Sequence, residues 1–309
     1  MALHGQILAQ PDRYLLRGKN MFDIIVVTYN PGEKLKTTLD SIYSQDFWDY
    51  RVVIKDGAST DNSLNILRDS GYFDDFKSAR TTIIEAPDKG IYDAMNVAVE
   101  SLKCVVSTNE CKGGSDNTTD KEYILHLNCG DTFSDRQVLG DVNDYIEEQD
   151  ISADSLNIFY GDQFNLMTQT RVSSAPKIND FALYRNVPCH QVCFYDRRLF
   201  DNRGYELKYR VRADYEHFLY CMYEEGANAH HMERVICRYE GGGFSETAEN
   251  RLKSASEHRE ITDHYMGRKA IKYRMIMALT LQPLRTRLAE SEHFSKMYNK
   301  VKTMIYKSR

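Results

Sequence analysis

Five polar motifs lie between residues 28 and 216, after apolar runs or at the start of predicted helices. They are Thr28-Tyr29-Asn30, Asp56–Asp61, Asp88–Asn96, Asn128–Asp131 and Arg212–Glu216. An aromatic ring can stack on a nucleobase, and a carboxylate accepts hydrogen bonds from an imide N–H or from ribose hydroxyls. Carboxylate oxygens are also the ligands that Mg²⁺ and Mn²⁺ prefer. These residue types therefore suit a site for a nucleotide and a metal-bound diphosphate.

The first three motifs hold the candidates for nucleotide binding. Tyr29 and Asn30 are expected to lie at the carboxyl edge of a sheet. Asp56 lies at the end of a predicted strand, where the sequence suggests no local structural role for it. Asp93 and Asn96 are three residues apart and fall opposite the apolar stripe of a predicted helix. A plain structural alternative stays open for each motif: a strand-to-helix turn, a capped turn and a solvated helix face.

Asp131 is the candidate metal ligand, because it follows the apolar strand Tyr123–Leu127 beside a flexible glycine. One carboxylate can suffice, since Mg²⁺ usually takes one or two protein carboxylates and completes its shell with phosphate oxygens and water. The structural alternative is a Gly-Asp turn before a helix.

Asp214 is the candidate general base, placed at the start of a predicted helix that ends near Glu224. A carboxylate held there in a cleft can accept a proton from an attacking hydroxyl, and the alternative is that it only caps the helix. His190, in Cys-His-Gln, is interpreted as a structural histidine in preference to a catalytic one. The triple glycine Gly241–Gly243 predicts either a loop that closes over substrate or a plain turn.

The elements that must position these residues are strands alternating with helices. Apolar runs predict strands at 22–28, 50–55, 81–85 and 123–127, and apolar residues at helical spacing follow the first three. This alternation predicts a mostly parallel sheet with helices on both faces, which binds ligands at the carboxyl ends of its strands. After about residue 150 the pattern changes to shorter strands, such as 156–160 and 191–195, and one clear helix.

Composition excludes several classes of protein. The 309 residues include only 17 Gly and 6 Pro, which excludes collagen-like and low-complexity chains. No apolar run approaches the roughly 20 residues of a membrane span, and residues 1–21 do not resemble a secretory signal. The seven cysteines contain no C-x-x-C pair, which argues against a disulfide framework and a zinc ribbon. The sequence thus predicts a cytoplasmic enzyme with reduced thiols.

Charge is distributed unevenly along the chain. Residues 251–309 carry 14 basic and 5 acidic residues, although the net charge of the whole chain is -5. Apolar stripes in this segment predict basic amphipathic helices, interrupted at Pro283. They could lie on an anionic membrane surface, at the inner face of the cytoplasmic membrane, or pack on the acidic body or on another subunit. The acidic body and the lack of a recognition motif argue against nucleic acid as a partner.

Taken together, the motifs resemble the inverting family 2 glycosyltransferases with a GT-A fold, over about residues 22–245. Asp-Gly-Ala-Ser-Thr-Asp, Pro-Asp-Lys-Gly-Ile-Tyr-Asp-Ala-Met-Asn, Leu-Asn-Cys-Gly-Asp and Cys-His-Gln are more narrowly similar to the branch that builds bacterial exopolysaccharides such as colanic acid. The resemblance implies an α/β fold, a Rossmann-like mixed sheet flanked by helices. The chain would divide into an N-terminal extension (1–21), the GT-A domain (22–245) and a basic amphipathic helical tail (246–309).

The resemblance also implies an activity. A sugar would move from a nucleoside-diphosphate sugar, at family level a UDP-sugar, to a hydroxyl of a glycan or lipid-linked acceptor, with Mn²⁺ or Mg²⁺ as cofactor. Asp131 would be the metal ligand of the family's D-x-D motif, and Asp214 the catalytic base. The residues expected to bind the donor are Thr28, Tyr29, Asn30, Asp56, Asp93, Asn96 and Asn128. Donor sugar, acceptor and oligomeric state, including a homo-oligomer, stay open.

Three positions depart from the family pattern. Cys129 replaces the first acid of D-x-D, Lys55 replaces the first of a common Asp pair, and Ala213 replaces the acid before Asp214. The first two departures, Cys129 and Lys55, motivate one alternative, a non-catalytic GT-A-like subunit that binds carbohydrate or aids assembly. A sugar-phosphate nucleotidyltransferase is a weaker alternative, because it needs a glycine-rich phosphate loop where this chain has Thr-Tyr-Asn-Pro-Gly.

Overall fold

The computed structural model describes residues 21–109, 121–241 and 248–279. Within these ranges the strands form one nine-stranded mixed sheet in the order β3-β2-β1-β4-β8-β6-β9-β5, with β7 paired to β6. Their bounds are β1 (Phe22–Thr28), β2 (Tyr50–Asp56), β3 (Thr81–Glu85), β4 (Tyr123–His126), β5 (Thr132–Phe133), β6 (Asn157–Asn165), β7 (Thr170–Val172), β8 (Cys193–Asp196) and β9 (Asn228–Tyr239).

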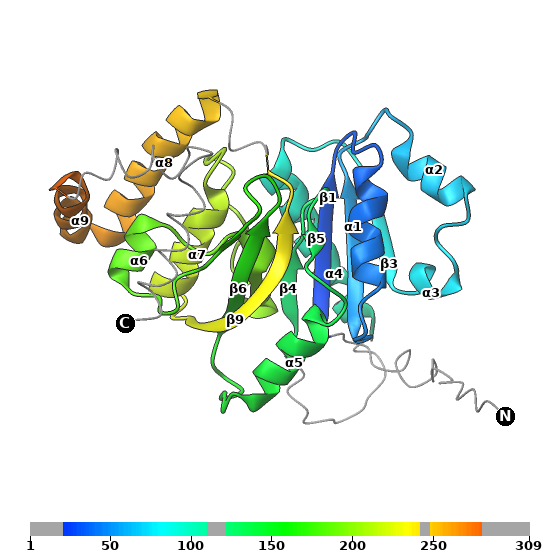
Figure 1. The fold of residues 1–309 in the computed structure, drawn as a ribbon, viewed down its shortest axis with the longest axis horizontal. Helices are drawn as coiled ribbons and strands as arrows, with labels where there is room; N and C mark the ends of the chain where they lie inside the picture. Colours follow the sequence, from blue (N-terminus) through cyan, green and yellow to red (C-terminus); the bar gives the residue numbers. More distant parts are fainter. Residues whose placement is uncertain (1–20, 110–120, 242–247, 280–309) are drawn as a thin grey trace.

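Helices flank both ends of the sheet. In Figure 1, α1 to α3 lie beside the parallel strands, and α6 to α9 lie at the opposite end, near β6 and β9. The helices are α1 (Lys34–Tyr43), α2 (Ser63–Asp69), α3 (Asp75–Ser78), α4 (Ile91–Asn109), α5 (Val138–Glu148), α6 (Asp180–Arg185), α7 (Ala213–Tyr223), α8 (Ala248–Met266) and α9 (Arg268–Leu279). Two short 3-10 turns, η2 (His190–Val192) and η3 (Arg197–Phe200), flank β8.

The parallel half of the sheet confirms the predicted alternation of strands and helices. β1 pairs in parallel with β2 and with β4, and β2 pairs in parallel with β3. Every residue of β1 is buried, which is why its uninterrupted apolar run identified it. The carboxyl ends of these strands lie at one edge of the sheet, so the motifs that follow them are gathered there.

The antiparallel half was predicted less completely. β8 pairs antiparallel with β4 and β6, and the strand prediction 191–195 starts two residues early because His190–Val192 form a turn. The sequence analysis missed β9, the longest strand, which pairs in parallel with β6. It carries polar residues such as His230 and Arg234 among its apolar ones, so it shows no continuous hydrophobic run.

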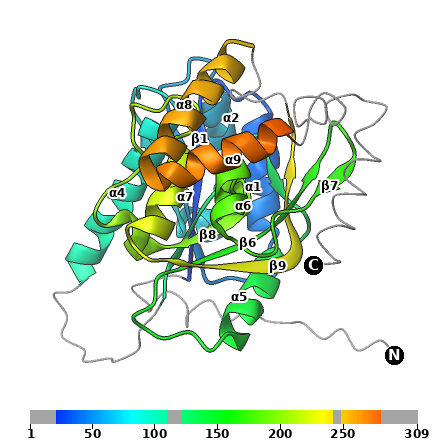
Figure 2. The same ribbon diagram turned by 90° about the vertical axis from the view of Figure 1, so that its left-hand side faces the viewer.

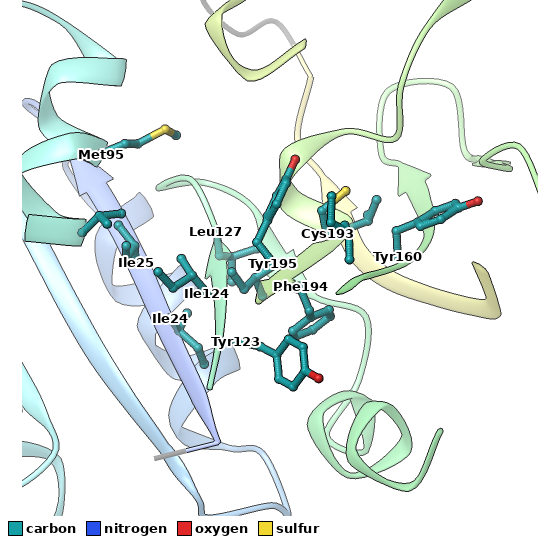
Figure 3. Packing of buried hydrophobic residues seen from close by; sticks show 14 of the residues in the cluster. Ile24, Ile25, Met95, Tyr123, Ile124, Leu127, Tyr160, Cys193, Phe194 and Tyr195 are labelled. Atoms are coloured by element: carbon teal, nitrogen blue, oxygen red, sulfur yellow. The ribbon is translucent and has the colours of Figure 1, made fainter. Parts of the chain in front are cut away.

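The core joins the two halves of the sheet. Figure 3 shows Ile25 of β1, Ile124 of β4 and Tyr195 of β8, which are buried on one face of these neighbouring strands. The ring of Phe22 lies 5.4 Å from that of Phe194, with the planes steeply inclined. Burial of such aromatic side chains is the main stabilising contribution to the junction.

Helices α8 and α9 belong to this same core. Ile261 of α8 and Ala270 of α9 are fully buried, and Figure 2 shows both helices lying across α6 and α7. The break between them falls at Gly267, whose φ of 51° favours glycine, whereas the predicted interruption at Pro283 lies outside the described residues. The buried faces of these helices therefore pack on the body.

The outer face of α9 is different. Ile271 and Met275 are more than half exposed, whereas Lys269 and Arg274 form ion pairs with Asp180 and Asp263. A membrane surface as partner for this stripe stays a prediction. Among the described helices, none is long and apolar enough to cross a membrane. The described cysteines, at 129, 189, 193, 221 and 237, form no disulfide with one another.

Gly161 sets a steric requirement on the sheet. It lies in β6 where the register with β9 shifts, and a Cβ there would stand 2.5 Å from the carbonyl oxygen of Arg234. We expect Gly161→Ala to lower the free energy of unfolding by about 1–3 kcal/mol, the usual cost of overpacking. Urea unfolding measures the change.

Gly140 in α5 is the matched control, because a Cβ there meets nothing within 4 Å. Gly140→Ala should raise the free energy of unfolding by about 0.5–1 kcal/mol, the helix propensity difference. An equal effect of the two substitutions would contradict the steric interpretation of Gly161.

Candidate active site

The loop after β1 leaves one aromatic ring exposed. Asn30 has a φ of 47°, its N–H donates to Ser59 Oγ (2.8 Å), and its Oδ1 accepts from Thr60 N (2.7 Å). Asn30 therefore ties this loop to the one after β2, while Thr28 is buried in the strand. The Tyr29 ring is 68% exposed and lies beside Gly57, where a Cβ would come within 3.2 Å of it. Tyr29 is the residue of this motif that is free to meet a ligand.

Asp56 has a local partner that the sequence did not reveal. Its Oδ2 accepts from Ser59 N (2.7 Å) and its Oδ1 from Ser59 Oγ (2.5 Å). The carboxylate is almost fully buried and holds the turn after β2. The capped-turn alternative thus describes part of its role, and each oxygen keeps a further lone pair for a ligand.

Lys55 has a structural role at its position. The side chain is fully buried, and Nζ donates to the carbonyl oxygens of Asp56 (2.9 Å) and Ala86 (2.7 Å) and to Asp88 Oδ2 (3.0 Å). The three ammonium hydrogens are therefore all used. This departure from the family pattern joins the end of β2 to the loop before α4.

Asp93 and Asn96 both bind the protein backbone. Asp93 Oδ2 accepts from Lys89 N (2.8 Å) at the start of α4. The side-chain amide of Asn96 makes two hydrogen bonds to the backbone of Tyr205. Asn96 Oδ1 accepts from Tyr205 N (2.8 Å), and Asn96 Nδ2 donates to the Tyr205 carbonyl oxygen (2.9 Å). Both side chains therefore have backbone partners, which differs from the solvated helix face that the sequence left open as the alternative, and donor binding by either residue stays a prediction.

Asp131 is buried at the end of the loop after β4. Its Oδ2 accepts from Gln191 Nε2 and its Oδ1 from Glu240 N, each at 3.0 Å. Burial raises the pKa of Asp131, and the hydrogen bond from Glu240 N partly offsets the rise. The Glu240 carboxylate lies against Gly130, 2.6 Å from where a Cβ would stand, and pairs with Lys34 at 2.7 Å. Neither Glu240 nor Lys34 was identified from the sequence, since both are brought here by the fold.

The surroundings of Asp131 fit a cation only if it takes few protein ligands. Each Asp131 oxygen accepts a single protein hydrogen bond, so a lone pair remains on each. Burial raises the pKa of Cys129 to about 11, which keeps its thiol neutral and a poor ligand. No cluster of three or more His, Cys, Asp or Glu suited to a metal occurs in the described ranges. The site fits a cation held by one carboxylate, diphosphate oxygens and water.

Asp214 is the second residue of α7, and Arg212 occupies the N-cap position. Its Oδ1 accepts from Tyr92 Oη (2.9 Å) and Tyr215 N (2.8 Å), and its Oδ2 lies 3.0 Å from His190 Nδ1. Burial alone would raise the pKa of Asp214, but the hydrogen bonds from His190 and Tyr92 bring it below the usual value. Asp214 is therefore a carboxylate at neutral pH.

His190 connects Asp214 to a second predicted residue. Its Nε2 lies 2.9 Å from Asn128 Nδ2, so the assigned amide orientation puts the ring hydrogen on Nδ1, toward Asp214. Asn128, expected from the resemblance to bind the donor, contacts His190 through Nδ2, and its binding of the donor stays a prediction. His190 is 9% exposed, whereas the Asp214 side chain is 24% exposed, so Asp214 is the group that reaches solvent.

Glu257 of α8 holds the loop before α7. Its two carboxylate oxygens accept from three successive N–H groups, those of Arg210 (2.9 Å), Val211 (3.0 Å) and Arg212 (2.9 Å). Glu257 is almost fully buried and fixes the backbone that leads into α7, up to and including the N-cap residue Arg212. No sequence signal linked this residue to Asp214, because the contact spans more than 40 positions.

A mixed sheet flanked by helices, with polar loops at the carboxyl ends of its parallel strands and a buried acid in the same half as β8, is the architecture of a GT-A-type glycosyltransferase. Residues 23–103 match the family model described as glycosyl transferase family 2. Proteins named PGL/p-HBAD biosynthesis glycosyltransferase from Mycobacterium bovis BCG and Mycobacterium tuberculosis H37Ra are each 32% identical over 229 residues, covering 74% of this chain and 80% of the relative. The chain belongs to glycosyl transferase family 2.

Solved structures confirm the fold. TarS of S. aureus, residues 1–349 with UDP, has a TM-score of 0.54 at 16% identity and covers 80% of this chain and 71% of that one. The chain spans 42% of a longer TarS chain. The mannosyltransferase PcManGT of Pyrobaculum calidifontis, with GDP-Man and Mn²⁺, has a TM-score of 0.54 at 16% identity, over 93% of this chain and 85% of that one.

Proposed function

We propose that the protein transfers a sugar, with inversion, from a UDP-sugar to a hydroxyl of a glycan or lipid-linked acceptor in bacterial surface polysaccharide synthesis. The observation that carries this proposal is the hydrogen-bonded, partly exposed carboxylate of Asp214, which can accept a proton. The relatives' names refer to PGL/p-HBAD biosynthesis, and one TarS structure holds UDP-GlcNAc. The buried contacts of Lys55 give that departure a structural explanation, so of the two departures behind the non-catalytic alternative only Cys129 is left without one.

Inversion needs a base on the side of the sugar opposite the leaving group. Asp214 takes the proton of the acceptor hydroxyl while the new C–O bond forms, and the nucleoside diphosphate departs with the bonding electrons. No covalent enzyme intermediate forms in this single displacement. Asp131 would hold Mn²⁺ or Mg²⁺, which when bound neutralises charge on the diphosphate.

The donor is proposed to lie along the loops after β1 and β2. Tyr29 offers its exposed ring to the base, and Asp56 offers a lone pair to the base or ribose. Asn30 supports both by fixing the loop that carries Ser59. Lys34, whose pKa is raised by its hydrogen bond to Glu240, is cationic and lies beside the proposed diphosphate position.

Removal of the Tyr29 ring should weaken nucleotide binding. Stacking of a base on an aromatic side chain contributes about 1–3 kcal/mol, so Tyr29→Ala is expected to raise the Kd for UDP by about 5- to 150-fold. Isothermal titration calorimetry with UDP measures this. Trp48→Ala is the control, because Trp48 is also exposed but precedes β2, at the opposite end of that strand from Gly57. An unchanged Kd in Tyr29→Ala would exclude stacking.

The function itself is tested by nucleoside diphosphate release from UDP-, GDP- and dTDP-sugars, with Mn²⁺, Mg²⁺ or chelator and with glycan or lipid-linked acceptors. Metal-dependent release from a UDP-sugar, with product of inverted configuration, is the expected result. Release from a GDP- or dTDP-sugar alone would contradict the proposed donor. Retained configuration in the product would contradict the single displacement.

A further inference from the structure

The hydroxyl of Tyr92 has two acceptors and one hydrogen. Tyr92 Oη lies 2.9 Å from Asp214 Oδ1 and 2.9 Å from the carbonyl oxygen of Val211. Burial and the neighbouring Asp214 charge raise the pKa of Tyr92 well above its usual value, so the phenol keeps its proton. A carbonyl and a carboxylate can only accept, so the single phenol hydrogen is shared between them while Asp214 is ionised.

The same geometry accommodates the protonated acid without movement. Asp214 Oδ1 already accepts from Tyr92 Oη and Tyr215 N, so the lone pair open to an acceptor proton is on Oδ2. Once Oδ2 carries that proton, Asp214 is neutral and the Tyr92 hydrogen can point wholly to Val211 O. Asp214 Oδ1, Tyr92 Oη and Val211 O each keep a hydrogen-bond partner whether Asp214 is ionised or protonated. No proton leaves these three oxygens, and only the direction of the Tyr92 hydrogen bond changes.

We propose that Tyr92 is a positioning residue for the catalytic base, whose hydroxyl turns from Asp214 to Val211 as Asp214 takes up the acceptor proton. This inference rests on the proposed function, in which Asp214 is the base. Transfer moves one proton from the acceptor hydroxyl to Asp214. Tyr92 and its two hydrogen-bond acceptors adjust to this change without a further donor or acceptor. The backbone at Val211 cannot shift away, because Glu257 binds its N–H and those of its two neighbours.

The chain offers a closely matched control in Tyr205. Its ring centroid lies 5.5 Å from that of Tyr92, and both residues are buried. The Tyr205 hydroxyl has no hydrogen-bond partner among the described residues. Replacing either tyrosine by phenylalanine removes one buried hydroxyl from the same aromatic cluster, but only Tyr92 contacts Asp214.

The test compares Tyr92→Phe and Tyr205→Phe with the natural chain, using the UDP-sugar that the natural chain turns over. We expect Tyr92→Phe to lower kcat by about 10- to 100-fold, the range for a hydrogen bond to a charged group, with the KM for the donor unchanged. Tyr205→Phe should leave kcat unchanged. Thermal unfolding of both variants reports any loss of folded protein.

The pH profile of kcat separates positioning from a structural role. Tyr92 stabilises the carboxylate, so its loss raises the pKa of Asp214, and the acid limb of the profile moves to higher pH in Tyr92→Phe. Other groups also face Asp214: His190 from η2, His126 from β4, Cys193 and Tyr195 from β8, and Tyr205. The first four are the same in both variants, and Tyr205→Phe shows what loss of the Tyr205 hydroxyl alone does to the profile. A lower kcat with an unmoved acid limb would overturn the proposal, as would wild-type kcat.

Asp214→Asn distinguishes failure of this inference from failure of the proposed function. If Asp214→Asn turns over like the natural chain, the base assignment itself is wrong. If Asp214→Asn is inactive and Tyr92→Phe matches Tyr205→Phe, only the role of Tyr92 is wrong. Adding Tyr92→Phe to Asp214→Asn should cause no further loss, because the two residues act as one unit.

Discussion

Asp214→Asn is expected to lower kcat by about 100- to 10,000-fold, the usual contribution of a general base. Asparagine keeps the size of the side chain and an oxygen for Tyr92 and Tyr215, but it cannot take up a proton. The Kd for UDP should stay unchanged, because Asp214 lies on α7, outside the proposed nucleotide loops. Nucleoside diphosphate release and calorimetry measure the two quantities.

Asp201→Asn is the control for this substitution. It removes the same charge from an exposed position after η3, in the same half of the chain. Its turnover should equal that of the natural chain. Undiminished turnover in Asp214→Asn would remove Asp214 from the mechanism, and a loss of UDP binding as well would show that the substitution disturbs the fold.

Asp131→Asn should lower kcat/KM by about 100-fold or more at a fixed concentration of Mn²⁺. A cation at a leaving group contributes several kcal/mol, and each 1.4 kcal/mol is about tenfold in rate. The amide keeps one oxygen for Gln191 or Glu240 N but loses the negative charge. Titration of turnover with Mn²⁺ should show a higher concentration for half-maximal rate in the variant.

Asp135→Asn serves as the comparison for Asp131→Asn. Asp135 lies four residues after Asp131 and forms a surface ion pair with Arg234, at 2.6 Å. It should leave the Mn²⁺ titration unchanged. Equal Mn²⁺ dependence in Asp131→Asn and the natural chain would exclude Asp131 as a ligand, and equal turnover with chelator would exclude a metal from the reaction.

The parallel half of the fold was readable from the sequence because local patterns determine it. β1 and β3 have the predicted bounds, and the apolar spacing between Ile91 and Leu102 marked α4 correctly. Strands buried on both faces appear as continuous apolar runs, and amphipathic helices repeat every three to four residues. Neither signal depends on knowing which segments meet.

Except for one local pair, the partners of the site residues were not readable from the sequence, because they depend on segments that meet only in the fold. Asp56 and Ser59 are three positions apart and could have been paired as a side-chain-capped turn. Gln191 and Glu240 meet Asp131 from η2 and the end of β9, and β9 itself was missed. Tyr92 lies within a recognised motif, but its contact with Asp214 spans 122 positions.

The binding of the Arg210, Val211 and Arg212 N–H groups by Glu257 has a consequence for the order in which the chain folds during synthesis. Synthesis proceeds from the N-terminus, so residues 210–214 emerge well before the residue that binds their backbone. Until α8 has docked, three adjacent N–H groups beside Asp214 lack their carboxylate partner. A nascent chain can therefore complete its parallel sheet early, whereas the geometry around Asp214 is finished only after residue 257 has been added.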